Sequence, residues 1–193
     1  ESDIIHCTTQ VEIHVLEKCN QFYLELVGKN GNYGMEVEAL YIDGEKANFL
    51  HANNKVLIDS PYGSWEAGET IRLELSYKGI AKDGLLISNN KYGKRSFFGD
   101  NWPDRAHHFL AVVDHPSDKA KVEFKITAPE HYEVIASGAK QNTKNLVDKR
   151  LLHHFKSKID FPTKVMVFAA SDFIVTEYGE LEGIPVSSWI FEG

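Results

Sequence analysis

The sequence has no continuous apolar run of about 18 residues, and it contains only two cysteines. The first absence predicts no membrane-spanning helix, because crossing a bilayer as a helix takes about 20 apolar residues. With two cysteines the chain can form at most one disulfide, so a fold held together by several disulfides is excluded. Cys7 and Cys19 could pair across a hairpin in an oxidising compartment, but the usual behaviour of scattered cysteines favours two unpaired thiols.

Basic clusters are also scarce. The chain carries 21 Lys and Arg against 28 Asp and Glu, a net charge of −7. No group of lysines and arginines alternates with aromatic residues, whereas a general nucleic-acid binder normally shows a basic patch or stripe. We therefore predict neither a nucleic-acid nor a membrane partner. The hydrophobic content of 42% and the length of 193 residues fit one globular domain.

The two ends carry no targeting signal. The chain opens Glu-Ser-Asp without an initiator methionine and closes Trp-Ile-Phe-Glu-Gly. We expect both ends to be cut from a longer polypeptide, so the compartment is left unassigned.

Alternation of apolar and polar residues dominates the chain. Every second residue of several runs is apolar, which is the pattern of a strand with one buried face. No convincing helix of ten residues or more is found. Short strands separated by turn signals such as Asp43-Gly44 and Ser137-Gly138 predict an all-β fold, mostly an antiparallel sandwich or a stack of sheets. The clearest runs are Val11–Val15, Phe22–Leu26, Ile71–Tyr77 and Val122–Ile126.

Two segments are predicted by different patterns. The continuous apolar run from Val165 to Ala170 is typical of a strand buried on both faces. The stretch from Ile80 to Pro103 is the longest one poor in strand signals, and long irregular segments of compact domains are often functional.

Nine histidines suggest a metal site, but their spacing does not support one. His107-His108 and His153-His154 are adjacent, and neighbours on a strand point to opposite faces. No residue is predicted to bind a metal. Asp114-His115-Pro116-Ser117-Asp118 contains the residue types of a hydrolase triad, yet triads are assembled from distant segments. A turn at Pro116, with Asp114 and Ser117 bonded to nearby backbone N–H groups, is the better interpretation.

Residues 99–120 carry the most informative pattern. They read Gly-Asp-Asn-Trp-Pro-Asp-Arg-Ala-His-His-Phe-Leu-Ala-Val-Val-Asp-His-Pro-Ser-Asp-Lys-Ala. This segment resembles the signature of the N-terminal β-domain of zinc aminopeptidases related to aminopeptidase N and leukotriene hydrolase. That signature commonly reads Ala-Arg-x-Trp-Phe-Pro-x-x-Asp-x-Pro-x-x-Lys-Ala. The residues that match it are Ala106, Phe109, Asp114, Pro116, Lys119 and Ala120, whereas His107 replaces the usual Arg and Ala111 the usual Pro.

The resemblance extends over nearly the whole chain and implies a saddle-like β-domain without its first strand. It implies a single non-catalytic domain over residues 1–193, followed beyond 193 by a catalytic domain on which it packs. Neither the His-Glu-x-x-His zinc motif nor the Gly-x-Met-Glu-Asn substrate loop occurs in the chain. The zinc ion and every catalytic residue are therefore expected outside it, and the chain alone is expected to need no metal.

The resemblance also implies a role in substrate binding. In the related enzymes a Gln or Glu from this domain, a few residues before the Ala-Arg pair, helps to bind the free α-amino group of the peptide substrate. Aligning on Gly99 and Trp102 places Asp100 there, with Asn101 and Asp104 as further candidates. A carboxylate or amide oxygen suits the task because it accepts hydrogen bonds from an ammonium group. Alternatively, Asp100-Asn101 forms only an Asx-type turn.

Two other functions remain open. The chain could be a stand-alone β-sandwich module that binds carbohydrate or protein, which predicts aromatic side chains exposed on one face. It could also be the scaffold domain of a degenerate family member that has lost the zinc motif.

Overall fold

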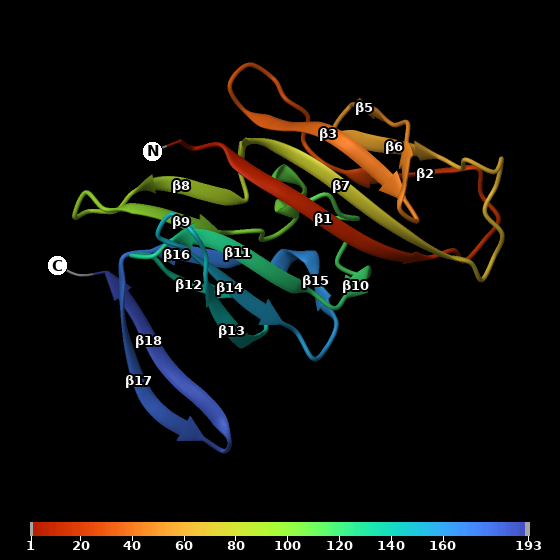
Figure 1. Cartoon of the computed structure of the whole chain (residues 1–193). Helices are drawn as coiled ribbons and strands as arrows, with labels where there is room; N and C mark the ends of the chain where they lie inside the picture. The colour runs from red at the N-terminus through yellow and green to blue at the C-terminus, as the bar shows by residue number, and fades with distance from the viewer. Residues whose placement is uncertain (1, 192–193) are drawn as a thin grey trace. The chain divides into compact units, whose positions relative to one another are not determined.

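The computed structural model describes residues 2–191 (Figure 1). Their contacts group into two compact units. The first unit consists of residues up to Gly84 together with Trp102–Asp118, and the second of Leu85–Asn101 with the residues from Lys119 onward. The chain therefore passes from one unit to the other three times. Among the described residues no helix is long and apolar enough to cross a membrane.

The first unit is built on two antiparallel sheets. Alternation in the sequence produces its long strands, whose apolar side chains point to one face. On β7, for example, Ile71, Leu73, Leu75 and Tyr77 are all buried. Buried residues of the second sheet, Leu24, Val56 and Ile58 among them, complete the core. The first sheet has the order β1 (Ile5–His14), β7 (Thr70–Ile80), β3 (Gly34–Ile42), β4 (Glu45–Ala47), and the second β2 (Gln21–Glu25), β6 (Lys55–Asp59), β5 (Leu50–Ala52).

The second unit contains four smaller antiparallel sheets. Its core lies around Tyr132, Val134, Phe155 and Ala170, with Phe97 and Phe168 packed against it. The sheets have the orders β12 (Glu133–Ala136), β16 (Phe168–Ser171), β9 (Arg95–Gly99), β8 (Leu85–Asn89); β11 (Glu123–Pro129), β14 (Arg150–Lys156), β13 (Ala139–Asn145); β10 (Lys119–Ala120), β15 (Phe161–Pro162); and β17 (Phe173–Leu181), β18 (Ile184–Phe191).

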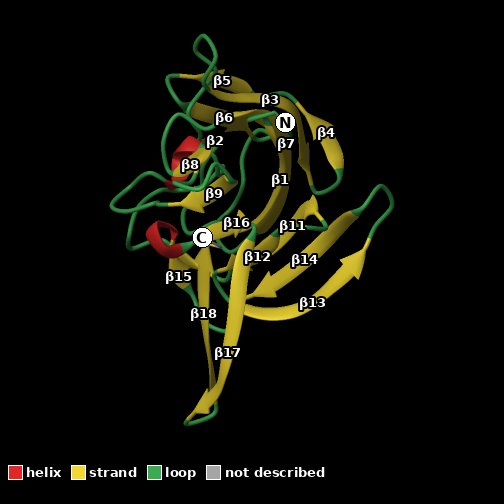
Figure 2. Ribbon diagram, turned by 90° about the vertical axis from the view of Figure 1, so that its left-hand side faces the viewer, coloured by secondary structure: helices red, strands yellow, loops and turns green. Residues whose placement is uncertain are grey.

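The predicted all-β class is confirmed. In the described part of the chain, helical backbone occurs only in two short 3₁₀ turns, η1 (Ala106–His108) and η2 (Thr163–Val165) (Figure 2). The turn at Asp43-Gly44 joins β3 to β4 as predicted, with Leu40 opposite Ala47. Cys7 and Cys19 are both free. Burial raises the pKa of the Cys7 thiol to about 12, so this thiol is unreactive at neutral pH.

One prediction from the sequence holds only in part, and another is wrong. The strand expected over 165–170 begins only at Phe168, because residues 163–165 form η2 and the carbonyl oxygens of Thr163 and Met166 accept hydrogen bonds from a side chain instead of a neighbouring strand. The stretch 80–103 is not strand-poor, since it contains the hairpin of β8 and β9. Polar turn residues at 90–94 hid this hairpin from the apolar pattern.

The Tyr77 hydroxyl ties the signature segment to the first sheet. It donates to the carbonyl oxygen of Phe109 at 3.1 Å and accepts from the N–H of Ala111 at 3.3 Å. Its one hydrogen is used on Phe109, so the Thr9 hydroxyl, 2.7 Å away, is the donor in that pair. The Tyr77 side chain is 1% exposed. A residue of the sheet thus satisfies backbone groups of the irregular segment.

Replacement of Tyr77 by Phe tests this connection. We expect the free energy of unfolding to fall by about 1–3 kcal/mol, because buried backbone groups of Phe109 and Ala111 lose their partner. Urea unfolding followed by tryptophan fluorescence measures the change. Tyr62, which is 78% exposed, provides the matched control. A Tyr77→Phe variant as stable as Tyr62→Phe would show that water replaces the hydroxyl at no cost.

Candidate functional site

Residues 99–105 connect β9 of the second unit to η1 of the first and contain all three predicted site residues. Gly99 ends β9 and pairs with Leu85 of β8. A Cβ atom at this position would lie 2.9 Å from Cβ of Val167 and 3.0 Å from the backbone nitrogen of Phe168, so only glycine fits without a shift. The segment therefore leaves β9 in tight contact with the chain that precedes β16.

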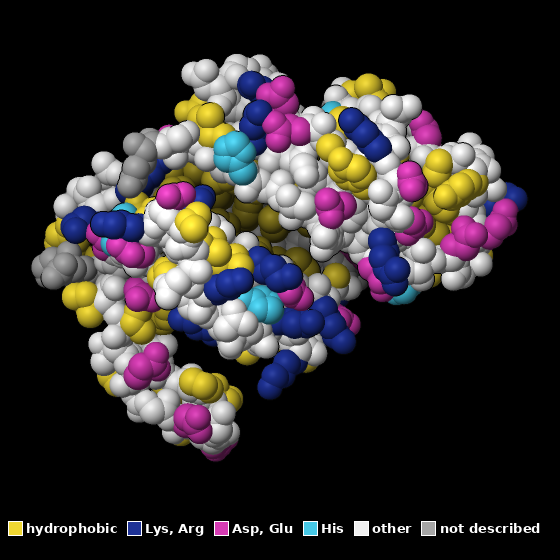
Figure 3. Space-filling view, viewed as in Figure 1, with side chains coloured by type: hydrophobic (Ala, Val, Ile, Leu, Met, Phe, Trp, Pro, Cys, Tyr) yellow, Lys and Arg dark blue, Asp and Glu magenta, His cyan; other side chains and the backbone are white. Residues whose placement is uncertain are grey.

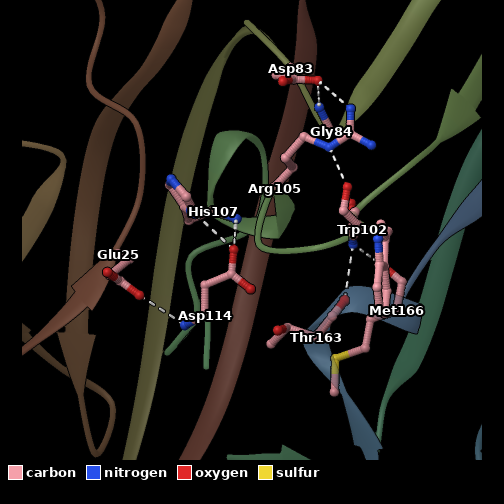
Figure 4. A network of polar contacts seen from close by, with 10 residues as sticks. Glu25, Asp83, Gly84, Trp102, Arg105, His107, Asp114, Thr163 and Met166 are labelled. Atoms are coloured by element: carbon pink, nitrogen blue, oxygen red, sulfur yellow. Dashed lines mark hydrogen bonds and ion pairs between the residues drawn. The ribbon is translucent and has the colours of Figure 1, made fainter. Parts of the chain in front are cut away.

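Asn101 is fully buried and fastens the segment within the second unit. Its Nδ2 atom donates to the carbonyl oxygens of Thr163 at 3.1 Å and of Met166 at 2.8 Å (Figure 4). Its Oδ1 atom is buried and has no hydrogen-bond partner. The side chain thus bonds to backbone more than 60 residues away in the sequence, where a local Asx-type turn was the alternative.

Asp100 lies between these two anchored residues and is half-buried. Gly99 and Asn101 fix the backbone on either side of it. Contacts within the second unit therefore fix the position of the Asp100 backbone from which its side chain extends. Asp104 is exposed and belongs to the first unit, as does the 60%-exposed Trp102. The structure therefore brings Asp100 and Asn101 together in one unit and places Asp104 in the other.

Arg105 anchors the other end of the segment in the first unit. Its Nε atom donates to the carbonyl oxygen of Trp102 at 2.6 Å, and its Nη1 atom to Oδ1 of Asp83 at 3.2 Å (Figure 4). Partial burial opposes ionisation of Asp83, but the N–H of Gly84 and the Arg105 guanidinium hold the pKa of that carboxyl below its ordinary value. Gly84 has φ +72°, and a Cβ there would collide with the Arg105 carbonyl oxygen.

A buried carboxylate organises the rest of the signature. Oδ2 of Asp114, whose side chain is 2% exposed, accepts from the backbone N–H of His107 at 3.1 Å and lies 2.7 Å from its Nδ1 (Figure 4). The N–H of Asp114 in turn donates to Glu25 at 2.9 Å. The hydrogen bond with Asp114 raises the pKa of His107, whereas burial, with His107 nearby, lowers that of His108.

The turn after Asp114 has the predicted character only in part. Asp114 bonds to a backbone N–H as expected, but the Ser117 hydroxyl lies 2.7 Å from Nδ1 of His115. The N–H of Asp118 closes the turn on the carbonyl oxygen of His115 at 3.0 Å. The carboxylate thus pairs with His107 of η1, not with the histidine beside it in the sequence.

No group of three or more His, Cys, Asp or Glu residues in the described range 2–191 is arranged to hold a metal ion. The adjacent histidines of β14 illustrate why. His153 is 2% exposed and directed toward the core, whereas Nε2 of His154 lies 2.9 Å from Oε1 of Glu123 on the opposite face of the sheet. These two side chains of β14 therefore cannot bind one metal ion together.

Comparison with protein families identifies the segment and its surroundings. The model of the Peptidase M1 N-terminal domain matches residues 4–165, most of the chain. The chain belongs to this family. The signature residues 106–120 and their partners Tyr77 and Glu25 all fall inside the matched range. Comparison with curated protein sequences found no significant match.

Solved structures with a similar fold confirm the architecture of this M1 N-terminal domain. An M1 zinc metallopeptidase from Deinococcus radiodurans is 23% identical, with a TM-score of 0.74 over 89% of this chain and 39% of that one. A mutant of it bound to the substrate Tyr-Ser-Ala is 20% identical, with a TM-score of 0.77 over 95% and 42%. A two-domain M1 zinc metallopeptidase mutant bound to L-tryptophan is 22% identical, with a TM-score of 0.78 over 96% and 43%. The chain thus spans about two fifths of each.

Sequence reasoning missed the anchoring roles of Arg105, Glu25 and Tyr77. Tyr77 and Glu25 bond to the signature of the M1 N-terminal domain, and Arg105 of the signature bonds to Asp83, over separations that sequence spacing does not connect. Glu25 and Asp114, for example, are 89 residues apart. The one available signal was the replacement of the usual Arg by His107, since a cation at that position suggests an acidic partner.

Substitution of Asn101 by Leu tests its anchoring role. We expect a loss of about 2–3 kcal/mol in the free energy of unfolding, because two buried carbonyl oxygens lose their donor. Asn145→Leu, on the fully exposed strand β13 of the same unit, is the matched control and is expected to change stability by less than about 0.5 kcal/mol.

Asn101→Asp adds a pH test of the same contact. An ionised carboxylate would face two carbonyl oxygens, so its folded-state pKa is raised and the variant is destabilised at neutral pH. Relative to wild type, stability should recover as the pH falls through that raised pKa, because a protonated carboxyl can donate one hydrogen bond. Urea unfolding at several pH values gives the difference, and a pH-independent difference would contradict this geometry.

The pair of His107 and Asp114 predicts a pH-dependent stabilisation. Because the folded-state pKa of His107 is raised, its contribution is fully present below the ordinary histidine pKa of about 6.5 and is lost as the pH rises through the raised value. The stability difference between wild type and His107→Gln should therefore decrease as the pH rises above about 6.5. His107→Arg, which restores a permanent cation, should remove this dependence. A difference that grows with pH would contradict the assigned partner.

Proposed function

We propose that this chain is the non-catalytic N-terminal domain of a zinc-dependent aminopeptidase. It packs on a catalytic domain of the same polypeptide and helps to bind the α-amino group of a peptide substrate. The match of the M1 N-terminal family model to residues 4–165 carries the proposal. The folded signature, with Asp114 buried and Asp100 held between two anchored residues, supports it.

Zinc belongs to the proposed whole enzyme, where it would polarise the scissile carbonyl and activate water. Because the described residues of this chain do not assemble a set of ligands, the metal ligands and the general base are assigned to the catalytic domain. The proposed contribution of this chain is limited to binding and orienting the substrate.

Asp100 is the best candidate for contact with the substrate amino group. A carboxylate accepts charge-assisted hydrogen bonds from an ammonium group, and partial burial strengthens such bonds. Asn101 is less suited, because its Nδ2 atom is used by two carbonyl oxygens and its Oδ1 atom is buried. Asp104 is exposed, and exposed charges contribute little. Asn101 is therefore a positioning residue for Asp100.

The geometry favours neither alternative function. A carbohydrate-binding module would expose aromatic side chains on one face. The exposed aromatic residues lie instead on separate strands and loops, for example Tyr62, Phe98 and Tyr178. A degenerate scaffold domain is distinguished by the polypeptide beyond Gly193, in which the family motifs Gly-x-Met-Glu-Asn and His-Glu-x-x-His should be sought first.

Kinetics of the full-length enzyme test the role of Asp100. Asp100→Asn should lower kcat/KM for aminoacyl anilides by about 10- to 100-fold, the cost of one charge-assisted hydrogen bond. The loss should fall mainly on KM, because the ammonium group is bound equally in the ground and transition states. Discrimination against N-acetylated substrates should weaken in parallel.

Asp104→Asn is the matched control and should leave these kinetic parameters within about twofold. The reverse result, with Asp104→Asn impaired and Asp100→Asn normal, would move the role to Asp104. Chelator-sensitive cleavage of aminoacyl anilides by the purified 193-residue chain would contradict the non-catalytic assignment itself.

A further inference from the structure

Positive charge is concentrated in one part of this acidic protein. Between Lys119 and Lys158 the chain carries nine Lys and Arg residues against four Asp and Glu, although the whole chain has a net charge of −7. Three strands of this stretch form the sheet β11-β14-β13 of the second unit. Figure 3 shows Lys and Arg side chains gathered around a histidine over the place where Figure 1 draws β11 and β14.

The register of this sheet places its cations on one face. Lys125 lies opposite His154, and Lys156 lies opposite Glu123. Cross-strand partners share a face of a sheet, and so do residues two apart on one strand. The buried Phe155 belongs to the other face. The cations on the exposed side, which we name the basic face, are Lys125, Lys144, Arg150, His154 and Lys156.

One carboxylate is outnumbered on the basic face. Oε1 of Glu123 lies 3.0 Å from Nζ of Lys125 and 2.9 Å from Nε2 of His154. Its Oε2 lies 3.4 Å from Nζ of Lys156. Hydrogen bonds from Lys125, and in turn from Lys156, hold the pKa of this carboxyl below its ordinary value. The two lysine side chains are still 61% and 55% exposed, so they are open to a further anionic group.

A free strand edge borders the basic face. β13 is the last strand of its sheet, and all seven of its residues are exposed. An edge strand presents N–H and C=O groups to which an extended chain can add. A bulge interrupts the ladder of β13 between Lys140 and Asn142, so the regular part of the edge runs over 142–145.

The charge of this edge selects among possible strands. Lys140 and Lys144 are the charged residues of β13. They oppose pairing with a second copy of the same strand, because like charges opposite one another are unfavourable. The same two cations favour an acidic strand.

We propose that β13 and the basic face bind an extended acidic segment of a partner protein, which adds to the sheet as a further strand and directs its carboxylates to the basic face. Among the described residues of this face, the one ring is the imidazole of His154, so a nucleic acid would find no aromatic platform for its bases. Such binding is independent of the proposed peptidase activity, because neither β13 nor the basic face contains Asp100 or its anchors.

Binding of a synthetic peptide to the full-length polypeptide tests the proposal. The probe alternates Glu and Thr over about eight residues, so that all its carboxylates share one face when it is extended. We expect saturable binding in isothermal titration calorimetry, at least about tenfold weaker when the ionic strength rises from about 0.05 M to about 0.5 M. An alternating Gln-Thr peptide should bind at least about tenfold more weakly. Absence of saturable binding would overturn the proposal.

Reversal of one charge locates the site. Lys144→Glu should weaken binding of the Glu-Thr peptide at least about tenfold and leave the Tm unchanged, because the residue is exposed. Lys46→Glu is the matched control, since Lys46 is an exposed lysine of β4, the last strand of a sheet in the first unit. This control should keep the affinity within about twofold. Equal affinities of the two variants would contradict the assigned surface.

Backbone methylation separates strand addition from charge attraction alone. Two probes, N-methylated at every Glu or at every Thr, keep the charge of the peptide but lose the N–H groups along one edge. One of the two should bind at least about tenfold more weakly than the unmodified probe. Unchanged binding of both would overturn strand addition. Tighter binding of an oligothymidylate or of anionic lipid vesicles, lost in Lys144→Glu, would assign the basic face to nucleic acid or membrane and overturn the proposal.

Discussion

Buried backbone that leaves the β ladder must find other hydrogen-bond partners, and this constraint shapes the whole signature segment. Among residues 100–118, only Val112 takes part in a β-bridge, with Glu25, and the buried positions Asn101, Phe109 and Ala111 lie outside any strand. Side chains supply the missing partners. The Tyr77 hydroxyl bonds to backbone groups of Phe109 and Ala111, and the Asp114 carboxylate accepts from the backbone N–H of His107. The Asn101 amide donates to the carbonyl oxygens of Thr163 and Met166. Asn101 and Asp114 belong to the segment itself, whereas Tyr77 belongs to β7, so the segment is held by its own side chains and by one of the sheet.

The constraint also explains why the signature is recognisable in the sequence. An apolar position of a sheet accepts several residues of similar volume. The Asp114 side chain is 2% exposed and bonds to both the backbone N–H and the imidazole of His107. Replacing it by another residue type would leave these buried groups without a partner, so fewer residue types are tolerated there. His107 in place of the usual Arg keeps a cation-capable partner for Asp114, so this departure from the family pattern preserves the contact that the fold needs.

Sequence reasoning predicted the β class and the longer strands because their information is local. Alternation over Ile71–Tyr77 is enough to place β7 and to select its buried face. It placed the start of the strand at 165–170 too early, because residues 163–165 form a 3₁₀ turn, the carbonyl oxygens of Thr163 and Met166 bond to Asn101, and β16 begins at Phe168. It also missed the hairpin of β8 and β9, whose polar turn resembles a loop. Partners such as Glu25 and Asp114 depend on the topology, which no local pattern contains.

The two compact units are interleaved in the sequence, and this has a consequence for how the chain folds during synthesis. The first unit is incomplete until Trp102–Asp118 has been made, since Tyr77 and Glu25 find their partners only there. Residues 85–101 emerge earlier, yet their strands β8 and β9 belong to one sheet whose other strands, β12 and β16, lie beyond 119. Neither unit can therefore be released by a single proteolytic cut or exchanged as one continuous piece of sequence.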